Sequence, residues 1–285
     1  MQVITNSTVR AVLQARPAIS HKGDFGRVLI IGGSQQYGGA AIMSASAAVY
    51  AGAGLVSVAS DLSVLSGLHA RLPEAMFIDY QQPFVQWSSA VQAADVVVVG
   101  PGLGITSFAV ELLRKILQTI QPTQTLIIDG SALSIIAHEK LTIPNTQLIL
   151  TPHQMEWARL SGVAIEQQTV ATNQAALAAY PNATLVLKKH HTEVYHQQQV
   201  QQLTIGGPSM ATGGSGDTLT GIIAAFCGQF GTHYQTICAA VYTHSAIADE
   251  LAKTQYVTLP SQVIQTLPHY MAKMIHQSKK KQQSF

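Results

Sequence analysis

Short runs of consecutive apolar residues recur along the chain and predict β-strands. They lie at residues 27–31, 55–59, 96–99, 126–128, 148–150 and 185–187. The run at 96–99 consists of four valines, and β-branched residues favour strands. Strands that are apolar on both faces are typical of a parallel sheet covered on both sides.

The segments between these runs predict helices. One apolar face follows helical spacing, at Phe108, Leu112, Leu113, Ile116, Leu117 and Ile120. Thr106 or Ser107 can cap this helix. Further helices are expected over 40–51, after Asp217 and over 239–251. Alternating strands and helices predict an α/β fold with a central, mostly parallel sheet and helices on both faces.

A hairpin is predicted later in the chain. Two strand-like segments, 194–195 and 200–203, flank a glutamine-rich turn, and we place this hairpin at the sheet edge. No linker or change in composition divides the 285 residues. We therefore expect one catalytic domain over 1–276, followed by a basic, flexible tail over 277–285.

Charged residues are scarce, at 11%, where a typical soluble domain has about 25%. The apolar content of 47% and the formal charge of +2 exclude a disordered chain, which combines few apolar residues with high net charge. Lys279, Lys280 and Lys281 lie in the tail, so the remaining chain is close to neutral. This excludes a nucleic-acid groove, which needs clustered basic side chains.

The scarcity of charge also raises the question of a membrane. Two stretches, 34–60 and 218–248, contain no Asp, Glu, Lys or Arg. Glycine and serine interrupt the first, and histidine and glutamine interrupt the second, which argues against lipid-facing helices. Residues 1–6 do not resemble a signal peptide. We expect a cytoplasmic, soluble protein in which Cys227 and Cys238 are buried thiols.

The clearest chemical motif is the sequence GGSGD at 213–217, followed by an apolar helix. Glycines allow backbone N–H groups to approach a ligand, and a helix N-terminus favours an anion. A carboxylate beside such a site suggests a general base, which makes Asp217 a catalytic candidate. The alternative is that Asp217 is an ordinary helix N-cap.

Other motifs are weaker. The glycine turn lacks the Gly-Lys-Ser/Thr of a P-loop, and residues 100–104 read G-x-G-x-G, which is not the dinucleotide fingerprint. Residues 32–34, with Asp61 after the next strand, match that fingerprint only weakly, which disfavours a hydride-transfer enzyme. His190, His191 and His196 do not make a recognisable zinc set, because adjacent histidines in a strand point to opposite faces. Trp87 and Trp157 are expected to be packing residues.

Several motifs taken together indicate a family. They are HKGDFG (21–26), GGS (32–34), YGGAA (37–41), AGAGLV (51–56), PE (73–74), GPGLG (100–104), Asp129, LTPH (150–153) with Glu156, LK (187–188) with Thr192, and MATGGSGD (210–217). In this order and spacing, the chain resembles the ADP/ATP-dependent NAD(P)H-hydrate dehydratases of the ribokinase-like superfamily along nearly its whole length.

The resemblance implies a repair reaction. The 6-hydrate of NADH or NADPH would be phosphorylated on its hydroxyl by ADP or ATP, with Mg²⁺, and elimination would restore the nicotinamide ring. It implies Asp217 as the base. Substrate would be bound by Ala40, Ala41, Gly102, Gly104, His153 and Asp217. Nucleotide would be bound by Lys188, Lys189, His190, His191, Thr192, Gly214 and Gly216. Asp129 and Glu156 would reach the metal through water, or else make structural hydrogen bonds.

The chain departs from the family pattern at three places. Asp129-Gly130-Ser131 replaces Asp-Ala-Asp, His153-Gln154-Met155-Glu156 replaces His-Pro-Gly-Glu, and Lys188-Lys189 replaces Lys-Gly. Two alternatives therefore stay open, a kinase of the same fold acting on a vitamin precursor or sugar alcohol, and a catalytically silent nucleotide-binding protein. The resemblance also implies a homotetramer. The chain resembles the stand-alone bacterial members of the family, which favours ADP over ATP as the phosphoryl donor.

Overall fold

One ten-stranded sheet runs through the protein, with the strand order β1-β10-β9-β8-β7-β6-β5-β2-β3-β4. The computed structural model describes residues 1–282, with side chains as far as residue 277. The strands are β1 (Gln2–Val3), β2 (Arg27–Ile31), β3 (Leu55–Ser60), β4 (Met76–Asp79), β5 (Val96–Val99), β6 (Thr125–Ile128), β7 (Gln147–Leu150), β8 (Ala183–Leu187), β9 (Glu193–His196) and β10 (Gln199–Gln202). Every described pairing is parallel except those of β9, which confirms the predicted α/β class.

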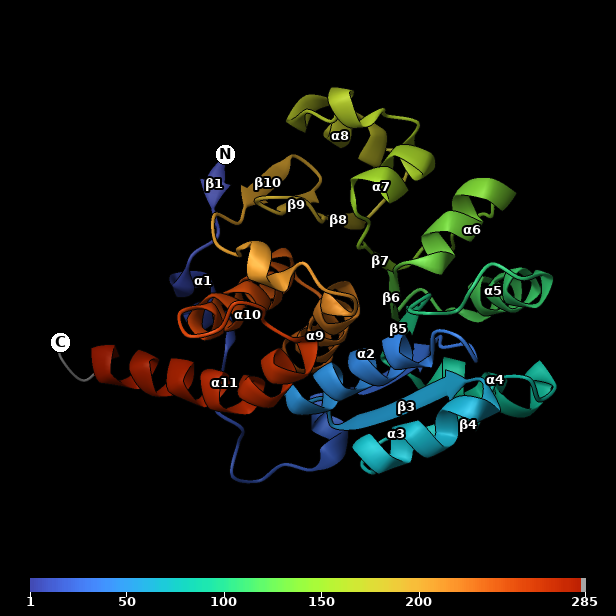
Figure 1. Cartoon of the computed structure of the whole chain (residues 1–285), viewed down its shortest axis with the longest axis horizontal. Helices are drawn as coiled ribbons and strands as arrows, with labels where there is room; N and C mark the ends of the chain where they lie inside the picture. The colour runs from blue at the N-terminus through green and yellow to red at the C-terminus, as the bar shows by residue number, and fades with distance from the viewer. Residues whose placement is uncertain (283–285) are drawn as a thin grey trace.

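Helices cover both faces of the sheet (Figure 1). They are α1 (Asn6–Val12), α2 (Gly38–Tyr50), α3 (Leu65–Arg71), α4 (Phe84–Ala93), α5 (Ser107–Thr119), α6 (Ser131–Glu139), α7 (Gln154–Ser161), α8 (Val170–Leu177), α9 (Ser215–Phe230), α10 (Tyr234–Ala252) and α11 (Pro260–Gln282). Short 3-10 turns are η1 (Lys22–Phe25), η2 (Leu62–Val64), η3 (Ile165–Gln167) and η4 (Pro208–Met210). The predicted basic tail, 277–285, lies largely outside the described side chains.

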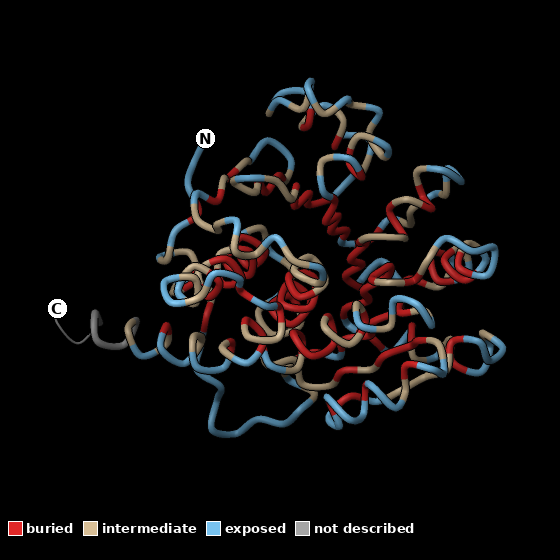
Figure 2. The backbone as a smooth tube through the Cα atoms, viewed as in Figure 1, coloured by how far each residue is buried: buried red, intermediate tan, exposed pale blue. Residues whose placement is uncertain are grey.

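Successive strand residues pack into two separate cores. In β2, Val28 and Ile30 belong to the core beneath α2, α9 and α10, whereas Leu29 and Ile31 belong to the core beneath α4–α7. This alternation follows from the two-residue period of a strand. It explains why the central strands are apolar throughout, and Figure 2 shows them buried along the middle of the molecule.

The predicted hairpin is present as β9 and β10, but its placement at the sheet edge was wrong. The two residues of β1 pair with β10 in parallel, and Ile4 then enters the core with 1% of its surface exposed. A strand of two residues is too short to show a period, so the sequence pattern did not reveal it. This segment covers the edge of the hairpin and joins the chain's beginning to the sheet.

Helix α5 agrees with the periodicity except at its first turn. The Thr106 hydroxyl accepts a hydrogen bond from the Ala109 N–H at 3.2 Å and caps the helix. Phe108 was expected on the buried face but is 42% exposed. Its ring instead lies 5.3 Å from the ring of Tyr80. Leucine and isoleucine positions one turn further on make the buried face.

Helices α2 and α9 pack unusually closely because glycine and alanine face each other. A Cβ added to Gly221 would lie 2.0 Å from the Ser44 carbonyl oxygen and 2.8 Å from the Ala47 Cβ. The small residues of the first uncharged stretch therefore serve helix packing. Cys227 and Cys238 are free and buried, as expected. Within residues 1–282, no helix is both long and apolar enough to cross a membrane.

Candidate active site

Three polar residues follow neighbouring parallel strands at the carboxyl edge of the sheet. Asp129 follows β6, Thr151 follows β7 and Lys188 follows β8. Ligands of open α/β sheets bind beyond this edge. The strand order therefore brings together side chains that are 59 residues apart in the sequence.

Asp129 is the centre of a buried polar network. Its Oδ1 accepts hydrogen bonds from Lys188 Nζ at 2.7 Å and from the Thr151 hydroxyl at 2.9 Å. Its Oδ2 accepts from the Thr220 hydroxyl of α9 at 3.0 Å. Asp129 is only 2% exposed, so these partners are what make a buried carboxylate tolerable.

The ion pair holds both of its members in the charged state. Burial alone would raise the pKa of Asp129, but the Lys188 ammonium and the donated hydrogen bonds keep the pKa below its usual value. Burial would lower the pKa of Lys188, yet Asp129 and Glu156 keep it above its usual value. The site therefore presents a fixed cation at the end of β8.

The N-terminus of α9 meets this cation. Gly214 is the N-cap, with φ of +95°, a left-handed conformation that favours glycine. A Cβ added to Gly216 would lie 3.2 Å from Lys188 Nζ. Backbone N–H groups of the first helical turn and the Lys188 ammonium therefore converge, which is an arrangement suited to a phosphate.

Asp217 is the third residue of α9 and is not its N-cap, so the alternative of an ordinary N-cap was wrong. Burial, which is the largest cause, and the neighbouring Asp129 carboxylate raise the pKa of Asp217 to about 6, although the Lys188 ammonium opposes the shift. A carboxylate with a pKa near neutrality is well matched to accept a proton from a substrate hydroxyl.

His153 and Glu156 form a capping box at the start of α7. His153 Nδ1 accepts from the N–H groups of Met155 and Glu156, both at 3.2 Å, and Glu156 Oε2 accepts from the His153 N–H at 2.8 Å. This is the structural hydrogen bonding that the sequence left open for Glu156. The His153 side chain remains 54% exposed and borders a cavity.

The predicted metal residues do not form a protein-only cation site. Both oxygens of Asp129 and one oxygen of Glu156 accept hydrogen bonds from the protein. Among the described residues, no group of three His, Cys, Asp or Glu side chains could hold a metal ion. The arrangement suits a Mg²⁺ ion carried mainly by nucleotide phosphates and water, which is the usual binding mode of that ion.

A cavity of about 820 Å³ adjoins the Lys188 ammonium. Most predicted nucleotide residues line it, namely Lys188, Lys189, His190, His191, Thr192 and Gly216, together with His153. The helices α9 and α10 supply Ser215, Leu219, Val241, His244 and Ser245. The volume is in the range of pockets that bind small molecules. Gly214 caps α9 beside this cavity.

His190 and His191 lie in a turn, contrary to the assumption that they belong to a strand. His191 has φ of +60°, and the two rings stack with centroids 3.9 Å apart. Lys189 turns to the buried Glu193, with Nζ 2.7 Å from Oε1. Of the two lysines, Lys188 is therefore the one directed at the helix N-terminus.

The glycine segment 100–104 lies against the start of α2. A Cβ on Gly102, whose φ is +64°, would lie 2.3 Å from the Tyr37 carbonyl oxygen and 2.9 Å from the Ala40 Cβ. Ala40 is partly exposed, whereas Ala41 is fully buried. Of the two predicted alanines, only Ala40 is therefore placed to line a ligand site.

Ser131, which stands where the family pattern has its second aspartate, has a structural role. Its hydroxyl accepts a hydrogen bond from the Gly104 N–H at 3.1 Å. Gly104 has φ of +79°, and the serine anchors this end of the glycine segment next to the buried Asp129. A side chain that differs from the family pattern thus still supports the loop.

The 21–26 motif is separate from this site. It precedes β2, at the amino edge of the sheet, and a Cβ on Gly26 would lie 2.6 Å from Gly228 Cα near the end of α9. The residues of the site that were not predicted include Thr220 and His244. Thr220 lies on the buried side of α9, four residues beyond Gly216, and burial lowers the pKa of His244 to about 4. Both residues lie in the uncharged stretch 218–248, where no recognisable site motif surrounds them.

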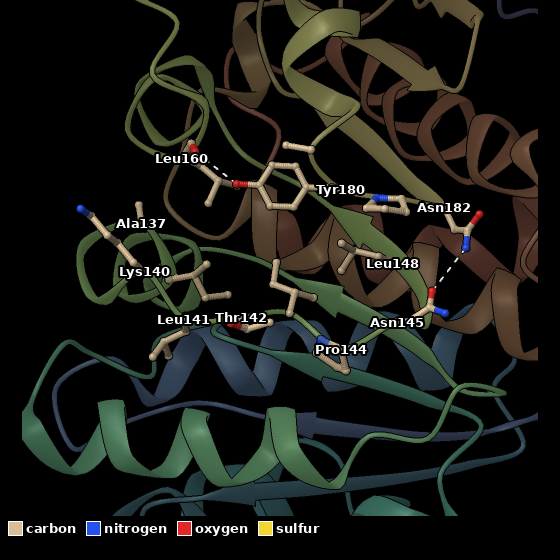
Figure 3. A pocket seen from close by; sticks show the side chains of 14 residues that line it. Ala137, Lys140, Leu141, Thr142, Pro144, Asn145, Leu148, Leu160, Tyr180 and Asn182 are labelled. Atoms are coloured by element: carbon tan, nitrogen blue, oxygen red, sulfur yellow. Dashed lines mark hydrogen bonds between the residues drawn. The ribbon is translucent and has the colours of Figure 1, made fainter.

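A second cavity, of about 680 Å³, lies at the amino edge of the sheet (Figure 3). Its walls are the end of α6, the segments that precede β7 and β8, and Leu160 of α7. The Tyr180 hydroxyl donates to the Leu160 carbonyl at 3.2 Å, and Asn182 donates to Asn145 at 3.5 Å. Because the candidate catalytic groups follow the opposite ends of these strands, this cavity is not part of the site.

Comparison with known proteins agrees with the geometry. A family model described as NAD(P)H-hydrate dehydratase matches residues 28–269. A protein of Lactiplantibacillus plantarum named ADP-dependent (S)-NAD(P)H-hydrate dehydratase is 49% identical over 271 residues, which cover 95% of this chain and 97% of that protein.

Solved structures show the same architecture. A ribokinase-like superfamily protein from Enterococcus faecalis superposes with a TM-score of 0.93 at 46% identity, covering 96% of each chain. An ADP/ATP-dependent NAD(P)H-hydrate dehydratase from Bacillus subtilis, co-crystallised with ATP and Mg²⁺, superposes with a TM-score of 0.83 at 28% identity, covering 96% of this chain and 98% of that one.

Proposed function

The chain belongs to the NAD(P)H-hydrate dehydratase family, and we propose that it restores NADH and NADPH from their 6-hydrates with ADP as the phosphoryl donor. The observation that supports this most is the convergence of Asp217, the first turn of α9 and Lys188 at one point. The pKa of Asp217 near 6 suits a base, while the helix N-terminus and the ammonium suit a phosphoryl group.

The first step is phosphorylation of the hydrate. Asp217 removes the proton from the C6 hydroxyl as that oxygen bonds to the terminal phosphorus of ADP, and AMP leaves. Backbone N–H groups near Gly216 and the Lys188 ammonium stabilise the charge on the transferred group. This arrangement relies on positioning and electrostatics, as phosphoryl transfer generally does.

The second step is elimination. The C6–O bond of the phosphorylated hydrate breaks, phosphate departs with the bonding electrons, and loss of a ring proton restores the double bond. Lys188 and the α9 amides hold the departing phosphate. Ala40, Gly102 and Gly104 line the side of the site on which the hydrate is expected, with His153 at the other border.

A bound Mg²⁺ ion would neutralise negative charge on the nucleotide phosphates. Asp129 and Glu156 would act on such an ion through water, since Asp129 already accepts hydrogen bonds at both oxygens. The magnesium dependence and the homotetramer implied by the resemblance stay predictions, as does the cytoplasmic location. Equilibrium dialysis with Mg²⁺, with and without ADP, tests whether the nucleotide carries the ion.

The test of the function is incubation with hydrated NADH, Mg²⁺ and either ADP or ATP. We expect the absorbance of reduced nicotinamide to return, with AMP and phosphate as products when ADP is used. Nucleotide binding without turnover would instead indicate the catalytically silent protein. A stable phosphorylated alcohol formed from another substrate would indicate a kinase of the same fold.

A further inference from the structure

Residues 205–211 form one wall of the 820 Å³ cavity. This wall contains two consecutive glycines, Gly206 and Gly207, and the short turn η4. Gly206 has φ of +100°. Consecutive glycines leave a backbone with many accessible conformations, so the position of the wall depends on contacts that restrain it.

One side chain restrains both glycines. Asp249 Oδ2 accepts a hydrogen bond from the Gly206 N–H at 2.9 Å, and Oδ1 accepts from the Gly207 N–H at 3.1 Å. Hydrogen bonds to an ionised carboxylate are stronger than those between neutral groups. Asp249 is not among the described residues that line the cavity. Its hydrogen bonds therefore act on the position of the wall.

Asp249 belongs to α10, and the same helix forms the floor of the cavity. His244 and Ser245 of α10 line it, and Asp249 comes one turn after Ser245. A Cβ on Gly206 would lie 3.1 Å from the Ser245 hydroxyl oxygen, so the wall approaches α10 closely. Asp249 thereby fixes the distance between the floor and one wall.

A second contact holds the far end of the wall. The Thr258 N–H donates to the Ser209 carbonyl at 2.9 Å, and the Thr258 hydroxyl donates to the Ser209 hydroxyl at 3.2 Å. The turn η4 is thus restrained from the segment after α10. With Asp249 acting at the two glycines, both ends of the wall are attached to the α10 region.

We propose that Asp249 is a positioning residue that shapes the nucleotide cavity and thereby sets nucleotide affinity. Its carboxylate is directed at backbone amides, so its role is to order the wall before a nucleotide enters. A wall that is already ordered reduces the entropy lost on binding. The inference rests on the proposed function only in that a nucleotide occupies this cavity.

Asp249→Ala tests the proposal, because it removes both hydrogen bonds without touching the cavity lining. Loss of two charge-assisted hydrogen bonds should raise the Kd and KM for ADP by about tenfold or more, while kcat at saturating ADP changes less than about twofold. Asp249→Asn keeps one acceptor oxygen and should give an intermediate affinity. Binding is measured with ADP by calorimetry and turnover with hydrated NADH.

The neighbouring Glu250 provides the matched control. It lies on the same helix turn, is exposed and pairs with Lys253, so Glu250→Ala should leave the affinity for ADP unchanged. Thermal unfolding of each variant separates a loosened wall from a damaged fold. If Asp249→Ala fails to fold, Asp249→Asn carries the test.

The outcomes are distinguishable. If the unaltered protein does not bind ADP, the proposed function fails before Asp249 is considered. If the unaltered protein binds ADP and both Asp249 variants bind it equally well, the positioning role is overturned. A fall in kcat at an unchanged Kd would also overturn it, because that pattern belongs to a group acting on the chemistry.

Discussion

Asp217 is the residue whose surroundings most affect what the protein can do. Its pKa near 6, raised by burial and by Asp129, lets it be ionised at neutral pH and still accept a proton. Below pH 6 the carboxyl group is protonated and cannot act as a base. The same environment disfavours the charge in the folded protein.

For the unaltered enzyme, we therefore expect kcat/KM to fall tenfold per pH unit below about 6, because one proton blocks the base. Asp217→Asn should reduce kcat by at least about a hundredfold while ADP still binds. The measurement is the pH profile of hydrated-NADH repair, with ADP binding as the control. A fully active Asp217→Asn would exclude this residue as the base.

Asp217 should also have a measurable cost in stability. Its pKa is raised above the ordinary 3.8, so the folded state binds the proton more tightly and stability falls as pH rises from about 4 to 6. Asp217→Asn should therefore stabilise the fold by about 1–2 kcal/mol at pH 7. The gain should vanish near pH 4; urea unfolding at both pH values checks this, and an equal gain at both would contradict it.

The Asp129–Lys188 pair should behave as a unit. Lys188→Met leaves the buried Asp129 carboxylate without its cation, which should cost about 3–5 kcal/mol of unfolding free energy. Adding Asp129→Asn should recover much of that loss, because both positions of the pair are then neutral. Denaturant unfolding of the two single variants and the double variant gives the coupling energy. Additive effects would argue against a direct pair.

At the scale of elements, the contact between α2 and α9 determines where the site lies. Gly221 lets the two helices approach until only a hydrogen atom fits against the Ser44 carbonyl. The same helices begin at the ligand edge, α2 next to Ala40 and α9 next to Gly216. Their separation therefore influences the spacing between the expected hydrate side and the phosphate side of the site.

Gly221→Ala tests this contact. The added methyl group would force the helices apart, and overpacking of this kind costs about 1–3 kcal/mol, more than alanine gains over glycine in a helix. Gly67→Ala in α3 is the matched control, because the nearest atom would be 3.5 Å away and the helix should gain up to about 1 kcal/mol. Thermal unfolding should therefore show a lower Tm for Gly221→Ala and an unchanged or higher Tm for Gly67→Ala. Equal changes in Tm would contradict the close contact between α2 and α9.

At the scale of the whole molecule, low charge is compatible with the proposed chemistry. The proposed site holds phosphate with helix N–H groups and one buried ammonium, so it needs few basic residues. Several of the scarce charges lie near the ligand edge, at Asp129, Glu156, Lys188 and Asp217. The remaining surface depends largely on uncharged polar side chains such as glutamine.

This composition should limit solubility in a pH-dependent way. The formal charge is +2 at pH 7 and the sequence pI is about 8.5, so electrostatic repulsion between molecules is weakest near pH 8.5. Light scattering against pH should show most self-association there. It should decrease toward pH 6, because the net positive charge grows as the pH falls further below the pI; a minimum of association at pH 8.5 would contradict this.

Much of the architecture could be predicted from periodicity alone. The predicted strand at Arg27–Ile31 and the valine strand at Val96–Val99 appear with the same bounds, because a buried strand requires a continuous apolar run. Helix α5 and the β9–β10 hairpin were also predicted. The two-residue β1 and the exposure of Phe108 were not, since very short strands and first helical turns carry little periodic signal.

The sequence by itself determined the α/β class, the family and the glycine-rich motif that carries Asp217, because these depend on local spacing and on residue types in order. Only the tertiary structure decided which groups meet. The Asp129–Lys188 pair, the Thr220 hydrogen bond and the hydrogen bonds of Asp249 to Gly206 and Gly207 join segments that are 42 to 91 residues apart. Such contacts follow from strand order and helix packing, which no local pattern specifies.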